Sequence, residues 1–593
     1  MPRDLPSARF YALAFLLGAA MQLAGSAGGF LHVWHGGLVD PDSYMRLVRI
    51  EQGLKLGHLV NMVQRDDSGA PLLIEWSRLF DAALVALAAP LAPFLGWHTA
   101  LRWAGIASAP LAAGALGVGL AFAVAPFAER RFLWLAPFLA PLFAGIHGFE
   151  RIGVIHYHII MVAGTAIALG WAVRTGTGGR NAATTSGIAA GVAAGIAIWI
   201  MPETMPFVLL GFVGLGWAWM FRPLGGVIRL AGLTFLATLA VALWLDPPHG
   251  GTFVAELDRV SIIYAALALA VVATGVWLAW LDGRDLPRGQ RAGLGMLGAL
   301  ACFALWLTAY PDVVRGPYAL IPPAQFRLFF GAMLETQPVH GLGPAAASLG
   351  PGLFGLAVAL ARAWRARRQP EAAGAWGIAA AGGLIALGLT ARFVIFQAFP
   401  TAFGAALLPV ALSDASAHFA ARPSRAAAAR IGLIALVLAA PYAIALAALL
   451  AQGKAHPAAS EPACALRGVA SLLTPAAGQV VLSRIGEVPE LLYRSRIIAV
   501  GSLYQHGVEG YLRARAAWRA PSAGPRPSAA LRATGARFVL FCPRVADSIF
   551  QGARPDALWF LLTSGHPPPW LRLVGTQAGT GFQLYRVLPT AAE

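Results

Sequence analysis

V-D-P-D-S-Y-M-R-L-V-R, at Val39–Arg49, follows the first long apolar segment of the chain, residues 10–30. Two carboxylates, Asp40 and Asp42, lie here beside Tyr44 and two arginines, where a helix would leave a membrane. A carboxylate resists dehydration, so a very apolar chain places few of them at a membrane surface. We interpret this stretch as the first part of an active site on the outer face of a polytopic membrane protein.

The composition supports a membrane protein. The chain has 593 residues, of which 58% are hydrophobic and only 12% are charged, whereas soluble proteins are about one quarter charged. Apolar runs of about 20 residues alternate with short Arg-rich or Pro/Gly loops, which predicts several membrane-spanning helices. The net charge of +17 comes from arginines in these loops. They form no stripe, so we favour positive-inside anchoring over nucleic-acid binding.

The distribution of arginine predicts the topology. A further short run, 79–95, is broken by Pro90 and Pro93, and we place it at the outer interface. About thirteen spans then put all basic loops and the N-terminus in the cytoplasm. The predicted basic loops are 129–131, 174–180, 222–229, 284–291, 362–368 and 422–430. The predicted spans are 10–30, 97–126, 132–147, 154–173, 184–201, 205–221, 226–245, 260–281, 292–309, 347–364, 373–391, 401–419 and 431–451.

This topology predicts two domains. Residues 1–451 form an all-α transmembrane domain with long external loops at 31–96 and 310–346, and residues 452–593 form a periplasmic α/β domain. Cys464 and Cys542 could pair if that domain faces an oxidising compartment. The predicted strands are Gln479–Ser483, Ile497–Val500 and Arg537–Phe541, and the predicted helix is Val508–Ala520.

The second outward loop holds Glu150, Arg151, His156 and His158. In an extended segment the two histidines project to the same side and could bind one cation. The alternative is a pair of interfacial histidines that bond to the backbone or to lipid headgroups. Glu150 and Arg151 are further cavity candidates.

Two more outward segments carry charge. E-T-Q-P at Glu335–Pro338 offers Glu335 as an acid that returns to the site of Asp40, or as an exposed loop residue. Arg392 ends an apolar run, where it could bind a phosphate bidentately or extend to lipid headgroups. Glu203 is a cavity candidate, with helix capping as its alternative role. We interpret the acids of the loop 246–259 (Asp246, Glu256 and Asp258) as solvated.

Taken together, these residues resemble the catalytic subunit of oligosaccharyltransferase and its bacterial relatives, membrane glycosyltransferases of the GT-C class. D-P-D-S-Y-M-R resembles that family's D-P-W-x-x-Y-R, which implies a catalytic and metal-binding role for Asp40. E-T-Q-P resembles S-V-S-E-H-Q-P, which implies the fifth-loop acid role for Glu335. A-R-F-V-I-F resembles the family's R-F segment, which implies a donor-phosphate contact for Arg392. A closer bacterial group shares D-S-Y-M-R-L and W-S-R-L, here Trp76–Leu79.

Two departures from this family bear on its chemistry. The family's second loop carries a D-x-D-type acid pair, whereas this chain has His156-Tyr-His158. The implied divalent cation, Mg²⁺ or Mn²⁺, could therefore differ, bind weakly or be absent. The W-W-D-Y-G motif that reads the acceptor sequon is missing from 452–593. Transfer to Asn is therefore unsupported, and the acceptor could be a glycan, a lipid or a protein.

The resemblance implies an inverting transfer from a polyprenyl-(di)phosphate-linked sugar. In this hypothesis Asp40 or Asp42 orients or deprotonates the acceptor nucleophile, and Arg392, Tyr44 and Arg46 bind the donor phosphate. A cation on Asp40, Glu335, His156 and His158 assists them.

The predicted location is the inner (cytoplasmic) membrane, with the C-terminal domain periplasmic. The alternatives are a lipid or glycan transporter or flippase, and a non-catalytic relative that kept the fold. No nucleotide-binding fingerprint is present, so no nucleotide cofactor is expected.

Overall fold

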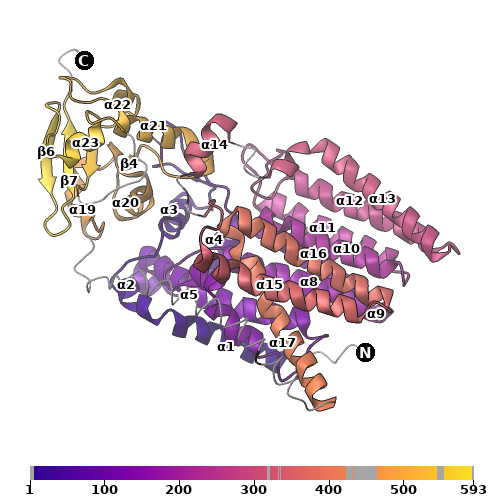
Figure 1. The fold of residues 1–593 in the computed structure, drawn as a ribbon. Coiled ribbons are helices and arrows are strands. Elements are labelled where there is room, and N and C mark those ends of the chain that lie inside the picture. The colour runs from indigo at the N-terminus through magenta and orange to yellow at the C-terminus, as the bar shows by residue number, and fades with distance from the viewer. Residues whose placement is uncertain are drawn as a thin grey trace. The chain divides into compact units, whose positions relative to one another are not determined.

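The computed structural model describes residues 6–67, 69–316, 321–331, 333, 335–421, 432, 464–543 and 553–589. Two compact units are present (Figure 1). Unit 1 comprises Met1–Leu31, Gly105–Ala319 and Glu335–Gly453, and unit 2 comprises His32–Ala104, Leu320–Leu334 and Lys454–Glu593. The predicted first external loop therefore belongs to the same unit as the C-terminal sheet.

Unit 1 is built from helices. Its elements are α1 (Ala8–Gly25), η1 (Ala27–Gly29), the second part of α5 (Ala92–Val124), α6 (Leu135–Leu139), η2 (Ala140–Leu142), α7 (Ala144–Glu150), α8 (His158–Thr177), α9 (Arg180–Ile200), η3 (Pro202–Thr204), α10 (Met205–Trp219), α11 (Gly225–Leu245), α12 (Ile262–Asp282), α13 (Arg288–Ala309), η4 (Pro311–Arg315), α15 (Leu342–Arg365), α16 (Pro370–Arg392), η6 (Val394–Gln397) and α17 (Ala398–Ala421). Glycines allow α11 and α12 to pack closely, because a Cβ on Gly232 would meet the backbone of Val272.

Ten helices in the described residues are long and apolar enough to cross a membrane. Together with the fold they make the chain a multi-pass membrane protein, as predicted. They are α1, α5, α8, α9, α11, α12, α13, α15, α16 and a helix over Val394–Phe419 that combines η6 and α17. The predicted basic loop 422–430 and the predicted last span 431–451 lie outside the described residues, apart from Gly432.

Two other predicted spans differ from the expectation. The run 132–147 is broken into α6, η2 and α7, because Pro137 and Pro141 supply no backbone N–H to a continuous helix. The run 205–221 forms α10, which has 15 residues and is therefore about 22 Å long. The run 79–95 forms α4 (Arg78–Ala88) and the start of α5, and α4 is not among the ten, as predicted.

The arginine-rich loops of unit 1 meet at one end of its helices, which we call the basic end. The bonds there are Arg222–Gly178 (3.1 Å), Arg291–Asp282 (2.6 Å), Trp217–Glu371 (3.0 Å) and Arg362–Asp414 (2.7 Å). Consecutive helices joined by short loops alternate in direction, so the loops 201–204 and 246–261 lie at the opposite end (Figure 1). The orientation rule requires this grouping of the arginines.

Unit 2 holds a five-stranded mixed sheet in the order β4-β3-β5-β7-β6. The predicted strands are confirmed as β3, β4 and β5, and the predicted helix as α21. Its elements are α2 (Phe30–Trp34, which begins in unit 1), α3 (Pro41–Leu56), β1 (Met62–Val63), β2 (Leu72–Leu73), α4, the first part of α5, α14 (Pro323–Phe330), α19 (Val469–Leu472), η7 (Thr474–Ala476), β3 (Val480–Leu482), η8 (Ile485–Glu487), α20 (Val488–Arg494), β4 (Ile498–Ala499), η9 (Gln505–Gly507), α21 (Val508–Arg519), α22 (Ala529–Ala533), β5 (Phe538–Phe541), α23 (Leu558–Thr563), β6 (Leu571–Thr576) and β7 (Gln583–Val587). Cys464 and Cys542 form a disulfide with 5.8 Å between their Cα atoms.

Candidate functional site

The segments that carry Glu335 and Arg392 lie side by side in unit 1. Ile395 N donates to Glu335 O (2.9 Å), and Val394 N donates to Gln337 O (3.0 Å). This pairing is available because α16 ends at Arg392, after which Phe393 takes an extended conformation. The following backbone N–H groups are then free of the helix and bind the returning loop. Two predicted site residues that are distant in sequence are thus held at one end of α16.

Arg392 is exposed and approaches the ring of its neighbour Phe393, with 4.4 Å from the guanidinium carbon to the ring centroid. No carboxylate among the described residues forms an ion pair with it. A guanidinium at the end of a membrane span is costly unless an anion compensates it. Its exposure leaves it accessible to such an anion.

The two histidines of the second outward loop are brought together. His156 and His158 are buried, and their Nδ1 atoms are 3.1 Å apart. His158 also stacks on Phe149, with ring centroids 4.6 Å apart. Two imidazole ligands of a tetrahedral cation would lie roughly 3.3 Å apart, given metal–nitrogen bonds of about 2.0–2.1 Å. The pair therefore fits either a hydrogen bond or a shared cation.

Glu150, at the end of α7, is only 1% exposed. Neither of its carboxylate oxygens has a hydrogen-bond partner, and its backbone oxygen accepts from Gln22 Nε2. Burial raises the pKa of Glu150 well above its usual range, which favours the protonated form of the side chain. The adjacent Arg151 is exposed.

Replacing Glu150 with Gln should change how stability depends on pH. The unfolded chain releases the proton at a pKa of about 4.3, whereas the folded chain keeps it at higher pH. Above about pH 4.3 the folded state therefore binds the extra proton, and the unfolding free energy falls with rising pH by up to about 1.4 kcal/mol per pH unit. Between pH 5 and 8 the melting temperature of the wild type should fall more than that of Glu150→Gln. The exposed Glu509→Gln variant should follow the wild type, and parallel curves for wild type and Glu150→Gln would contradict the assignment.

Glu203 lies in η3, directly before α10. A carboxylate at this position is favoured by the partial positive charge of the helix N-terminus. Its place fits the helix-capping role that the sequence offered as an alternative.

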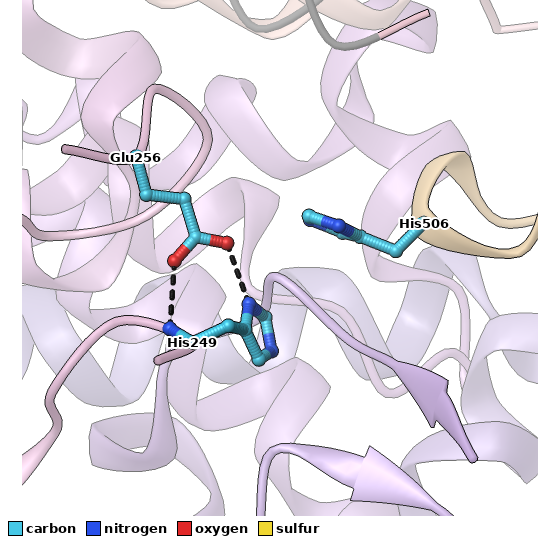
Figure 2. A group of neighbouring side chains, drawn as sticks. All are labelled: His249, Glu256 and His506. Atoms are coloured by element: carbon cyan, nitrogen blue, oxygen red, sulfur yellow. Dashed lines mark hydrogen bonds and ion pairs between the residues drawn. The ribbon is translucent and has the colours of Figure 1, made fainter. Parts of the chain in front are cut away.

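The expectation that the acids of the loop 246–259 are solvated is wrong. Asp246 is 1% exposed and pairs with buried Arg259 at 2.5 Å. Trp199 Nε1 donates to the other oxygen of Asp246 at 3.1 Å. Figure 2 shows two hydrogen bonds between His249 and Glu256, from the backbone N (2.9 Å) and from Nδ1 (2.5 Å). Asp258 is likewise buried.

The charges of this loop compensate one another. Burial alone would raise the pKa of Glu256, but the hydrogen bonds and charge of His249, together with Arg259, bring it below its usual value. Sequence reasoning missed this network. The available signal was one short loop that holds three acids together with an arginine and a histidine.

In unit 2, Asp40 caps the N-terminus of α3. Its Oδ1 accepts from Ser43 N (2.8 Å) and from Ser43 Oγ (2.9 Å), and Pro41 occupies the first turn. Such a cap contributes about 1 kcal/mol. Asp42 Oδ1 accepts from Tyr504 Oη at 2.8 Å. The predicted catalytic carboxylates thus also have structural roles.

Arg46, which the sequence predicts as a donor-phosphate ligand, is buried and paired within unit 2. Arg46 is 1% exposed and binds Asp81 at 2.9 Å, and Arg49 binds the same carboxylate at 2.5 Å. Arg46 also lies over the ring of Trp76 at 4.4 Å. Because positions 46 and 49 share one face of α3, both guanidiniums reach a single acid on α4. Arg46 is therefore committed to the interior of unit 2.

Tyr44, the third predicted phosphate ligand, is buried. Its hydroxyl accepts from Leu38 N at 2.8 Å and from Arg494 at 3.2 Å. Burial, followed by the charge of Glu490, raises the pKa of Tyr44 to about 12. The hydroxyl therefore stays protonated at neutral pH.

A long apolar cavity of about 760 Å³ runs between α5, α8, α10, α16 and α17 of unit 1. Arg288 and Glu371 line it at the basic end, and Phe207 and Phe399 line it at the start of α10 and α17. On α16 its lining extends to Ala386, six residues before Arg392, which is about 9 Å along the helix.

Asp40 belongs to unit 2, whereas Glu335 and Arg392 belong to unit 1. The convergence of all three residues in one pocket remains a prediction.

No protein-family model and no curated protein matches the sequence. Among solved structures, the chain is similar to the oligosaccharyltransferase AglB of Archaeoglobus fulgidus in complex with an inhibitory peptide and a dolichol-phosphate. The TM-score is 0.65 at 12% identity, covering 98% of this chain and 75% of that chain. The apo form of this enzyme gives a TM-score of 0.62 at 15% identity, covering 90% and 70%.

The complex of the same enzyme with Zn and sulfate gives a TM-score of 0.60 at 15% identity, covering 98% and 74%. The chain therefore has the fold of a GT-C membrane glycosyltransferase, which confirms the fold that the sequence resemblance implied.

Proposed function

We propose that this chain, which has an oligosaccharyltransferase fold, is an inverting GT-C glycosyltransferase of the membrane. It moves a sugar or glycan from a polyprenyl-(di)phosphate-linked donor to an acceptor on the extracytoplasmic face. The observation that carries the proposal is the apolar cavity of unit 1, which leads along α16 towards Arg392 and the adjoining Glu335 segment. The apolar cavity suits a long lipid tail, and the guanidinium of Arg392 suits the phosphate of that lipid.

The predicted site residues have separate tasks in the proposal. Arg392 binds the leaving phosphate and neutralises the charge that develops as the glycosidic bond breaks. Glu335 supplies the acid of the fifth outward loop, whose backbone pairs with the segment that follows Arg392. Asp40 or Asp42 accepts a hydrogen bond from the acceptor nucleophile and orients it towards the sugar carbon.

The buried pair His156 and His158 fits a divalent cation, since its nitrogens are 3.1 Å apart. Imidazole ligands suit Zn²⁺ better than Mg²⁺, which prefers oxygen ligands. The related archaeal enzyme has been solved as a complex with Zn and sulfate. When bound, such a cation would supply positive charge opposite the leaving phosphate.

The proposed location is the inner membrane, with the C-terminal sheet in the periplasm. The disulfide between Cys464 and Cys542 supports this side, because such bonds persist in oxidising compartments. The gathering of the arginine loops at the basic end supports the cytoplasmic side for that end.

Filling the cavity tests the proposal. Gly214 lines the cavity, and a Cβ on it would meet no atom within 4 Å, so Gly214→Phe should block lipid entry without a backbone clash. We expect polyprenyl-linked sugar to co-purify with the wild type and to be lost at least about tenfold from Gly214→Phe, as measured by mass spectrometry of extracted lipids. Glycan transfer to the acceptor should fall in parallel, as measured by glycan profiling of cells that carry the variant.

Gly216→Phe is the matched control. It lies on the same helix, has no atom within 4 Å of its Cβ position, and does not line the cavity. It should keep both the lipid and the activity. Recovery of ordinary phospholipid alone from the wild type, with an unchanged glycan profile in the Gly214→Phe strain, would refute the donor assignment.

A further inference from the structure

Besides the apolar cavity of unit 1, a polar pocket of about 410 Å³ lies within unit 2, and we call it the basic pocket. Three segments build it: the residues directly after α2, the first turns of α5, and the part of the chain around α19 and α20. Its basic side chains are Arg102, Arg467, Arg494, His35 and His98. None of them is among the residues to which the proposed transfer reaction assigns a role.

Neutral groups hold two of the guanidiniums in place. Arg102 donates to Val33 O at 2.8 Å, and Arg494 donates to Gly36 O at 3.2 Å. Bonds to carbonyl oxygens orient a guanidinium but leave its charge in place. These two arginines are therefore positioned before any ligand arrives.

The carboxylates at the pocket are too few to neutralise it. Glu490 binds Arg494 at 2.6 Å, and Glu51 binds His98 at 2.7 Å. Within the described residues, Arg102 and Arg467 form no ion pair, and Arg467 is exposed. An excess of positive charge therefore faces an open pocket, which favours an anion with several acceptor oxygens.

The pocket lies at the start of a membrane span. His98 and Arg102 are in the first three turns of α5, which is one of the ten candidate spans. Large apolar side chains nearby in sequence are exposed, including Phe94 (85%) and Trp34 (72%). Exposed aromatic residues beside arginine at the end of a span are typical of the level of lipid headgroups.

We propose that the basic pocket binds the phosphate ester of an anionic membrane phospholipid. Its arginines make charge-assisted hydrogen bonds to the phosphate oxygens, and the aromatic side chains of Trp34 and Tyr493 border the headgroup. The lining of this pocket is mainly polar and aromatic, whereas unit 1 contains a long apolar cavity. A phospholipid, whose acyl chains stay in the bilayer, fits the pocket better than a polyprenyl donor.

The proposal is tested by lipid binding to the purified full-length protein. The protein is first delipidated, and binding of each added probe is then measured by native mass spectrometry. The probes are dioleoylphosphatidylglycerol, dioleoylphosphatidylcholine, a polyprenyl phosphate and glycerol 1-phosphate. We expect phosphatidylglycerol to bind the wild type more tightly than phosphatidylcholine. Arg467→Gln should weaken it about fivefold and Arg102→Gln/Arg467→Gln about 25-fold, since each arginine near an anionic lipid contributes about 1 kcal/mol.

Arg526→Gln is the control, because Arg526 is exposed in unit 2 and does not line the pocket. It should bind phosphatidylglycerol within twofold of the wild type. Because Arg102 also donates to Val33 O, its replacement could destabilise the fold, so the melting temperatures of all variants are compared. If the double variant does not fold, the Arg467→Gln variant alone decides the test.

Three results would overturn the proposal. In the first, phosphatidylglycerol binds Arg467→Gln as tightly as the wild type. In the second, only polyprenyl phosphate depends on the arginines, which would make the pocket part of the donor site. In the third, glycerol 1-phosphate binds as tightly as the intact lipid, which would remove the membrane as the source of the ligand. Loss of phosphatidylglycerol binding with normal glycan transfer would leave the proposed function untouched.

Discussion

Arg392→Ala is expected to lower the rate of glycosyl transfer by about a hundredfold or more. A preorganised donor of charge-assisted hydrogen bonds to a developing anion contributes about 10²–10³ in rate. Arg392 is exposed at the end of α16, and the backbone pairing of residues 391–395 with 335–339 holds its segment in place. Removing the side chain should therefore leave the fold intact and reduce the rate, measured by transfer from a defined polyprenyl-linked donor in detergent.

Two further variants sharpen the interpretation of Arg392. Arg392→Lys keeps the charge but loses the bidentate geometry, so it should recover only part of the rate. Arg368→Ala removes an exposed arginine from the basic loop 362–368 and should be fully active. Full activity of Arg392→Ala, at an unchanged melting temperature, would remove Arg392 from the donor site.

Asp81→Asn is expected to cost about 3–5 kcal/mol of stability. One buried carboxylate binds both Arg46 (2.9 Å) and Arg49 (2.5 Å), and all three side chains are at most 1% exposed. Removing the partner of a buried charge leaves that charge desolvated and poorly compensated, which is the costly case for a buried ion pair. A large fall in the melting temperature of the full-length protein in detergent would report the loss.

The control for Asp81 is Asp312→Asn. Asp312 pairs with Arg315 on the surface, and both side chains are more than half exposed. Water screens such a pair, so the substitution should change stability by less than about 1 kcal/mol. Equal melting temperatures for Asp81→Asn and the wild type would show that the two arginines do not depend on this acid.

Sequence reasoning succeeded where the information is local. Whether an apolar run is long enough to form a membrane helix depends on its own residues. The strands around Val480 and Phe538 could be recognised because they are short apolar runs between turn residues. The grouping of the arginine loops followed from counting charges between runs.

The site was only partly accessible from sequence. The order of the motifs brought Glu335 and Arg392 into one hypothesis, and their segments do pair. A linear motif could not show that Arg46, predicted to bind a phosphate, pairs with Asp81, 35 residues later. The acids of the loop 246–259 were misjudged for the same reason, since a polar loop and a buried charge network have similar compositions.

The sequence by itself therefore determined that this is a multi-pass helical membrane protein with a C-terminal α/β part. Hydropathy and charge act over a single turn or span, so they can be read without a fold. Only the tertiary structure decided which charged side chains pair with one another, as Asp246 does with Arg259. It also decided which ones stay accessible, as Arg392 and Arg467 do. Electrostatic pairing acts between residues that are close in space, and the distance along the chain does not reveal which residues those are.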